Sequence, residues 1–174
     1  SDLFYKGELL SCLSKSENKI LWKGLQQGLS FEPVKHSSNS SESKEEIDRI
    51  EQMVNQLLGC SYQLVKQNNE GTSVIKGIIS PDEILITAPY NLQVNQLENR
   101  LSGKARIGTV DRFQGQEAPI SIHSLTASDA ENAPRGIGFV LDPDRLNVAI
   151  SRAQCLSIVV GSPDLATGIT GTVE

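Results

Sequence analysis

The chain has 174 residues, 38% of them hydrophobic and 21% charged, a composition typical of a globular domain with an apolar core. Sixteen Lys and Arg residues against 21 Asp and Glu residues give a net charge of −5, which excludes binding of nucleic acid through bulk positive charge but not through a local basic strip. No apolar run reaches the roughly 18 residues that a membrane span needs. Three widely separated cysteines form neither a disulfide framework nor a zinc motif, so we expect an intracellular, cytoplasmic protein with no membrane partner and no metal ligands of its own.

The chain begins with Ser1, and its single methionine is Met53, so we expect a piece of a longer protein. Residues 1–30 contain two short apolar stretches interrupted by glycines. We expect them to form a peripheral N-terminal segment beside a main domain at residues 31–174.

The main domain opens with a predicted strand at residues 31–36 and a serine-rich loop. A helix follows, because apolar residues at positions 47, 50, 54, 57 and 58 form one helical stripe. Ser41 or Ser43 can cap the N-terminus of this helix, and Gly59 ends it.

Short apolar runs predict further strands at residues 62–66, 74–79, 84–88, 107–110, 120–125 and 156–160. Leucines at helical spacing predict a helix over 92–101, and Asp142-Pro143 predicts the start of another. Alternating strands and helices indicate an α/β fold with a parallel sheet and helices on both faces. Ligands of such sheets gather at the carboxyl ends of the strands, so we expect the chemistry directly after Ala88, Val110 and Val160.

Three sequence features resemble known functional sites but do not meet the requirements of those sites. Gly103-Lys104 is not a phosphate-binding P-loop, because Glu98 and Ala105 stand where that motif needs Gly and Ser or Thr. Asp82-Glu83 precedes a buried strand, which is the wrong end of the sheet for a metal site. The two histidines, His36 and His123, are too isolated for a metal site or a triad, and we expect His123 to be a packed, hydrogen-bonded strand residue.

Two segments are more polar than segments that only form the core of a domain. Residues 109–117, T-V-D-R-F-Q-G-Q-E, pass directly from an apolar strand into a dense polar run, which can also be a turn followed by a capped helix. Residues 145–153, R-L-N-V-A-I-S-R-A, place Arg145 and Arg152 on one helical face with Ala149 between them. Two guanidinium groups on a thin helical face suit phosphate oxygens, although a plain charged surface helix has the same pattern.

Together these segments resemble superfamily 1 helicases. Residues 109–117 resemble motif V, residues 145–153 resemble motif VI, and residues 87–93 resemble the motif IV region. The order and spacing also agree from about residue 31 to 163, and the branch with the nonsense-mediated-decay and Okazaki-fragment helicases is the most similar. The resemblance implies a RecA-like domain, a three-layer parallel sheet of the P-loop NTPase type, and the second of two such domains.

The resemblance also implies roles for individual residues. Arg152 would be the catalytic arginine finger that reaches the γ-phosphate of ATP. The ATP-binding residues would be Gln116, Glu117 and Arg145, with Arg145 pairing with Glu117 or supporting the finger. The residues that line a single-stranded nucleic-acid channel would be Thr87, Thr109, Asp111 and Arg112.

The P-loop and the metal-binding acidic pair belong to the first domain of such helicases and are not found in this sequence. The resemblance therefore implies that ATP with Mg²⁺ is held mostly by that domain of the same parent chain, and that this piece alone is inactive. The other implied partner is single-stranded DNA, in repair or replication, with RNA as a second possibility. The alternative function is a non-catalytic α/β interaction domain that keeps a helicase-like scaffold.

Overall fold

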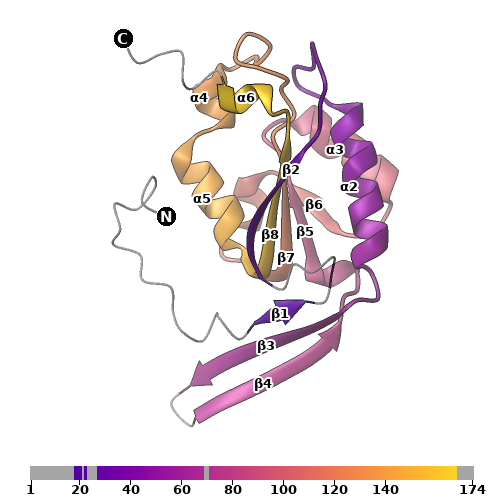
Figure 1. Ribbon diagram of the computed structural model, residues 1–174, viewed down its shortest axis with the longest axis vertical. Coiled ribbons are helices and arrows are strands. Elements are labelled where there is room, and N and C mark those ends of the chain that lie inside the picture. The colour runs from indigo at the N-terminus through magenta and orange to yellow at the C-terminus, as the bar shows by residue number, and fades with distance from the viewer. Residues whose placement is uncertain (1–17, 21, 23–26, 69–70, 168–174) are drawn as a thin grey trace.

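A computed structural model describes residues 18–20, 22, 27–68 and 71–167 of the chain. Its centre is a parallel sheet of five strands (Figure 1). In spatial order the strands are β2 (Gly28–Pro33), β8 (Ala153–Gly161), β7 (Ala118–Ser124), β5 (Ile84–Thr87) and β6 (Arg106–Gly108). The parallel α/β sheet expected from the alternating pattern is confirmed.

Helices cover both faces of this sheet, so the domain has three layers (Figure 1). One face carries α2 (Lys44–Leu57) and α3 (Asn91–Leu101), and the other carries α4 (Ile137–Val140) and α5 (Pro143–Ser151). The short helices are η2 (Pro81–Glu83), η3 (Val110–Phe113) and α6 (Asp164–Thr167). The predicted helices at residues 92–101 and after Asp142 are confirmed, and Asp142 caps α5 by accepting from the Arg145 backbone N–H at 2.9 Å.

Local sequence explains why α2 forms where it does. The Ser43 side chain accepts from the Glu46 backbone N–H, which caps the helix as predicted, and Gly59 follows its end with a φ of +86°. The buried stripe includes Ile50, Val54 and Leu57, all with no exposed surface. Each such side chain contributes on the order of 2 kcal/mol to stability. This stripe packs on the sheet and fixes one side of the domain.

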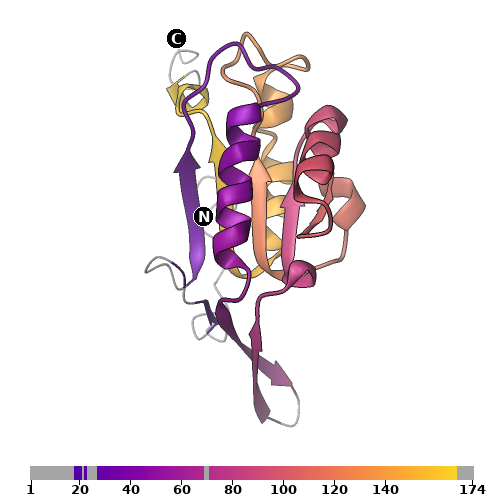
Figure 2. The same cartoon turned by 90° about the vertical axis from the view of Figure 1, so that its right-hand side faces the viewer.

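A second, smaller sheet extends beyond the domain (Figures 1 and 2). It is antiparallel and consists of β1 (Lys19–Ile20), β3 (Ser61–Asn68) and β4 (Gly71–Ile78). The two longer strands were expected from the sequence, but their separation from the main sheet was not. The hairpin leaves the domain where Ile79 exchanges backbone hydrogen bonds with Gly59 and Cys60, each at 2.9 Å.

Strand boundaries differ from the sequence prediction by one to three residues in most strands, and β2 and β8 show the reasons. β2 begins at Gly28 and ends at Pro33, whereas residues 31–36 were expected, because backbone pairing with β8 continues over polar positions such as Ser30. β8 begins at Ala153, three residues early, because it follows α5 with almost no loop. The polar Gln154 conceals this start in the sequence. No helix among the described residues is long and apolar enough to cross a membrane, and those residues include no cluster of three or more metal-ligating side chains.

Candidate functional site

The segment from Thr109 to Glu117 crosses the full height of the sheet. Since β6 and β7 run parallel, the connection from the end of one to the start of the other must pass from the carboxyl edge to the amino edge. Helix η3 covers the first part of this path, and Gly115, with a φ of +78°, makes the final bend. The two ends of this polar segment therefore lie at opposite edges of the sheet.

The C-terminal end of the segment belongs to a cluster of polar side chains at the amino edge of the sheet. We call it the amino-edge cluster. Arg106 donates to the Gln116 side chain at 3.1 Å and to the Glu117 carbonyl oxygen at 3.2 Å. Gln154 donates to the Glu117 carboxylate at 3.2 Å. The Ala118 backbone N–H donates to the carbonyl oxygen of Arg152 at 3.0 Å. The cluster comprises Arg106, Gln116, Glu117, Arg152 and Gln154.

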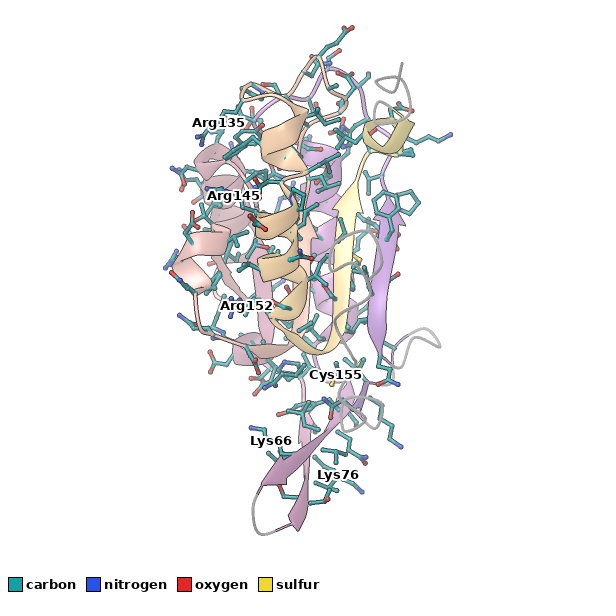
Figure 3. The ribbon with its side chains drawn as sticks, turned by 90° about the vertical axis from the view of Figure 1, so that its left-hand side faces the viewer. Lys66, Lys76, Arg135, Arg145, Arg152 and Cys155 are labelled. Carbon is teal, nitrogen blue, oxygen red and sulfur yellow. The ribbon has the colours of Figure 1, made fainter. Side chains whose placement is uncertain are left out.

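Arg152 lies at the C-terminal end of α5, where the helix gives way to β8 (Figure 3). Its Nε is buried and has no hydrogen-bond partner among the described residues. No carboxylate of those residues lies within ion-pair distance of its guanidinium. A buried donor without a partner is costly, so this side chain fits a site completed by an anion from outside the chain.

The position of this cluster corrects the expectation that the chemistry lies at the carboxyl ends of the strands. Gln116, Glu117 and Arg152 come just before β7 and β8, so they lie at the amino edge. Arg145 is not in the cluster, because it is in the first turn of α5, roughly 10 Å of helix away from Arg152. Its guanidinium lies 3.5 Å from Asp111, and Glu117 has Gln154 as its side-chain partner instead.

The carboxyl edge holds the residues expected to line the nucleic-acid channel. Thr109 directly follows β6, is half-buried, and its hydroxyl has no hydrogen-bond partner among the described residues. Asp111 is exposed and faces Arg145 of α5. Arg112 turns the other way, pairing with Glu98 of α3 at 3.0 Å. Neighbouring residues of η3 thus face opposite sides of the domain.

Thr87 ends β5 at the same edge, but its side chain points into the domain. The residue is 1% exposed, and its hydroxyl lies 2.8 Å from Nδ1 of His123 in β7. The expectation that His123 is a packed, hydrogen-bonded strand residue is confirmed. Complete burial lowers the pKa of His123 to about 4, so the ring is neutral near pH 7. The side chain of Thr87, which was expected to line a nucleic-acid channel, is therefore buried and already bonded, and its strand is paired on both sides by β6 and β7.

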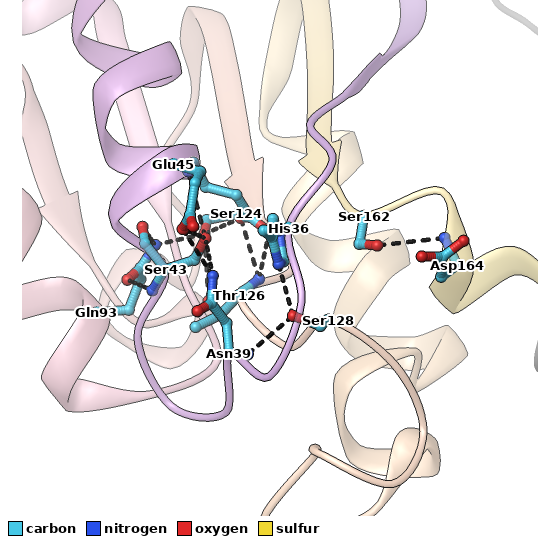
Figure 4. A network of polar contacts seen from close by, with 11 residues as sticks. His36, Asn39, Ser43, Glu45, Gln93, Ser124, Thr126, Ser128, Ser162 and Asp164 are labelled. Carbon is cyan, nitrogen blue, oxygen red and sulfur yellow. Dashed lines mark hydrogen bonds and ion pairs between the residues drawn. The ribbon is translucent and has the colours of Figure 1, made fainter.

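A buried polar network holds the loops of the carboxyl edge together (Figure 4). Glu46 of α2 accepts from the Thr126 backbone N–H at 3.0 Å and from the Ser124 hydroxyl at 2.6 Å. Its carboxylate also lies 2.9 Å from Nε2 of His36, whose Nδ1 lies 2.7 Å from the Ser128 hydroxyl. The side chains of Glu46 and His36 are fully buried, and Thr126 has a φ of +71°, so the network fixes a turn that is unfavourable for a threonine.

Two members of the amino-edge cluster, Arg106 and Gln154, were not singled out from the sequence. Arg106 opens β6 and lines an open cavity of about 510 Å³ with Arg112 and Gln116. Gln154 lies two residues after Arg152 and is the second residue of β8. A polar residue within the first two positions of a buried strand is the signal that could have identified either one.

The chain is similar to several known proteins. The chain matches the AAA domain family over residues 1–164. It is 31% identical over 192 residues to mov-10-B.1 of Danio rerio, a protein named as a helicase, with 94% of this chain and 18% of that protein covered. It is 40% identical over 102 residues to the regulator of nonsense transcripts 1 homolog of Drosophila melanogaster, with 53% and 8% covered.

A third relative is armi of Drosophila melanogaster, named as an RNA helicase, which is 39% identical over 95 residues. That alignment covers 50% of this chain and 8% of the relative. The chain thus spans less than a fifth of the length of the relatives that it matches. With its three-layer parallel sheet, the chain belongs to the AAA domain family, as an α/β domain of the superfamily 1 helicase type.

Proposed function

We propose that this chain is the second of two RecA-like domains in an ATP-dependent superfamily 1 helicase, and that Arg152 is its arginine finger. The observation that carries the proposal is the buried Nε of Arg152, which has no partner among the described residues, in a residue whose backbone carbonyl accepts from the Ala118 N–H at the amino edge of the sheet. An anion placed beside this guanidinium would satisfy its unpartnered donor. The γ-phosphate of ATP bound to the first domain would supply it.

The finger stabilises the negative charge that builds up on the phosphoryl group during transfer, an effect worth about 10³ to 10⁵ in rate. The ATP and Mg²⁺ would be bound mostly by the first domain, with the metal neutralising phosphate charge. In this chain Gln116 and Glu117 face the nucleotide sugar or the water around the metal. Arg145 supports the finger through the shared helix α5, since it lies too far along that helix to pair with Glu117.

The nucleic-acid track lies at the carboxyl edge of the sheet. The free hydroxyl of Thr109 can donate to a phosphate or sugar oxygen, and Asp111 and Arg112 flank it on η3. Thr87 is left out of the track, because its side chain is buried and its hydroxyl is bonded to His123. The bound nucleic acid is single-stranded and is held through its backbone. We propose DNA, in repair or replication, as the substrate. The name of armi as an RNA helicase makes RNA the alternative to test.

The deciding experiment replaces Arg152 by Ala in the full-length parent protein. We expect loss of nearly all ATPase activity stimulated by nucleic acid, while ATP affinity changes little, because the finger acts on charge that develops only during transfer. Arg49→Ala is the matched control, since Arg49 is paired with Glu32 on the opposite face of the domain. Turnover of the Arg152 variant within a few-fold of wild type would contradict the finger assignment.

The rival function is a non-catalytic interaction domain with the same scaffold. A parent protein that carries a G-x-x-x-x-G-K-[ST] loop upstream and hydrolyses ATP favours the helicase. A parent without that loop and without ATPase activity favours the rival. Comparing stimulation by single-stranded DNA and RNA of one sequence then decides between the two substrates.

A further inference from the structure

Arginines of this acidic chain are mostly neutralised by its own carboxylates. All seven arginines are described, and four of them form ion pairs with described carboxylates, namely Arg49, Arg100, Arg112 and Arg145. Arg106 instead donates to the Gln116 side chain and the Glu117 carbonyl. Arg152 and Arg135 remain, and no described carboxylate lies within 4.0 Å of either. Arg152 has a proposed phosphate partner, whereas Arg135 has no assigned role.

Arg135 is exposed and stacks on an aromatic ring at the carboxyl edge. Its Cζ lies 3.8 Å from the centroid of the Phe139 ring, and the Cζ of Arg145 lies 4.7 Å from the same centroid. Both distances are within the range of cation–π contacts. One ring therefore holds two guanidinium groups close together, and the described carboxylate that forms an ion pair with them is Asp111, 3.5 Å from Arg145.

The ring is held firmly in place. Phe139 packs against Tyr90 with centroids 5.7 Å apart and against the smaller apolar cluster that contains Leu125 and Leu146. Its backbone N–H donates to the carbonyl of Gly136, whose φ of +78° turns the chain into α4. The side chains on the ring are thus presented by a rigid platform.

From these observations we propose that Arg135, Phe139 and Arg145 form a second contact for single-stranded nucleic acid, which binds backbone phosphate through the two guanidinium groups. This inference rests on the proposed function. Planar guanidinium groups suit phosphate oxygens, and a guanidinium on an aromatic ring can also stack against a base. In a chain of charge −5, an arginine without a described carboxylate partner, such as Arg135, is a place where a polyanion can gain an ionic contact.

The position of this contact extends the track proposed above. Arg145 joins it to η3 through Asp111, so the contact lies beside Thr109 at the carboxyl edge. Figure 3 shows Arg135, Arg145 and Arg152 in one column along α4 and α5. A single-stranded nucleic acid that passes from η3 along this column reaches Arg135. Arg152, at the opposite end of the column, stays available to the nucleotide.

The test uses the full-length parent protein and a fluorescent single-stranded oligonucleotide, with affinity measured over a series of salt concentrations without nucleotide. For Arg135→Gln we expect roughly fivefold weaker binding and a salt dependence reduced by about 0.7 in log–log slope, the value for one lost phosphate contact on a single strand. Arg135→Lys should keep most of the slope but only part of the affinity, because the ammonium does not stack. Arg49→Gln, a half-buried and paired arginine on the other face, should equal wild type.

Several outcomes would overturn the inference. If wild type and Arg49→Gln bind and hydrolyse ATP while Arg135→Gln matches them in affinity and slope, the contact does not exist and the proposed function stands. If Arg135→Gln weakens ATP binding and leaves oligonucleotide binding unchanged, the phosphate recognised belongs to a nucleotide. If the wild-type parent binds no single strand at all, the proposed function itself is wrong.

Discussion

The guanidinium of Arg145 lies 3.5 Å from the carboxylate of Asp111, and this pair links the first turn of α5 to η3. At the other end of the same helix, the Arg152 carbonyl accepts from the Ala118 backbone N–H. Helix α5 is therefore tied to residues 111–118 at both edges of the sheet. Under the proposed function, a shift of η3 on nucleic-acid binding would reach the helix that carries the proposed finger through these two contacts.

The Arg145–Asp111 pair should be weak. Its side chains are 37% and 74% exposed, so water screens the attraction. A double-mutant cycle with Asp111→Ala and Arg145→Ala, measured by urea unfolding of the chain, should give a coupling energy below about 1 kcal/mol. A coupling above about 2 kcal/mol would mean that Arg145 is committed to Asp111 and is not available to a phosphate.

Replacing Thr109 tests the proposed nucleic-acid track separately from the proposed nucleotide site. Thr109→Ala in the full-length protein should weaken single-strand affinity roughly fivefold, the effect of one lost hydrogen bond, and leave ATP affinity as in wild type. Thr109→Ser keeps the hydroxyl and should retain the affinity. Equal loss of both affinities, or of neither, would argue against this placement.

The buried network gives a prediction on stability with a control from the adjacent residue. Glu46→Gln removes a buried charge that faces His36 and replaces one acceptor oxygen with a donor, so we expect a loss on the order of 3 kcal/mol in the free energy of unfolding. Glu45→Gln, at an exposed position of the same turn, should cost about 0.5 kcal/mol. Similar values for both variants in urea unfolding would contradict the importance of the network.

Burial of His123 makes stability depend on pH. Its pKa is about 4 in the folded chain and 6.5 as a free group, so only the unfolded chain takes up the proton as pH falls through this window. Stability is therefore lost between pH 6.5 and 4, by up to about 3 kcal/mol, and rises again with increasing pH. His123→Asn keeps a hydrogen-bonding group for Thr87 but does not titrate, so its unfolding free energy should depend less on pH.

Because every other titrating group is shared, the difference between wild type and His123→Asn reports His123 alone. Urea unfolding at several pH values between 7 and 4 measures it. A difference that stays constant with pH would show that His123 does not titrate in this window.

Sequence patterns predicted the sheet well because its strands are short, apolar and bounded by turn residues. β5, with all four residues buried, is a clear case. They also identified the caps at Ser43 and Asp142, since capping is a local interaction. The strand boundaries were less accurate where pairing with a neighbour extends a strand over polar residues, as at the start of β8.

The site was harder to assemble from sequence alone. The Gln116–Glu117 pair was placed at the wrong edge of the sheet, because a motif that follows one strand was assumed to stay at that strand's end. Arg135 was not noticed, since its stacking on Phe139 depends on a turn at Gly136 that has no periodic signal. The burial of Glu46 with His36 depends on side chains 10 positions apart and on loops from β7, which no local pattern encodes.

The β3–β4 hairpin has a consequence for how such domains diversify. The two ends of the hairpin meet where Ile79 exchanges backbone hydrogen bonds with Gly59 and Cys60. These bonds close the base of the hairpin. An arm rooted in this way can grow, shrink or change its tip during evolution without altering the order of the parallel strands. Proteins with the same five-stranded sheet can thus acquire different accessory surfaces at this single point.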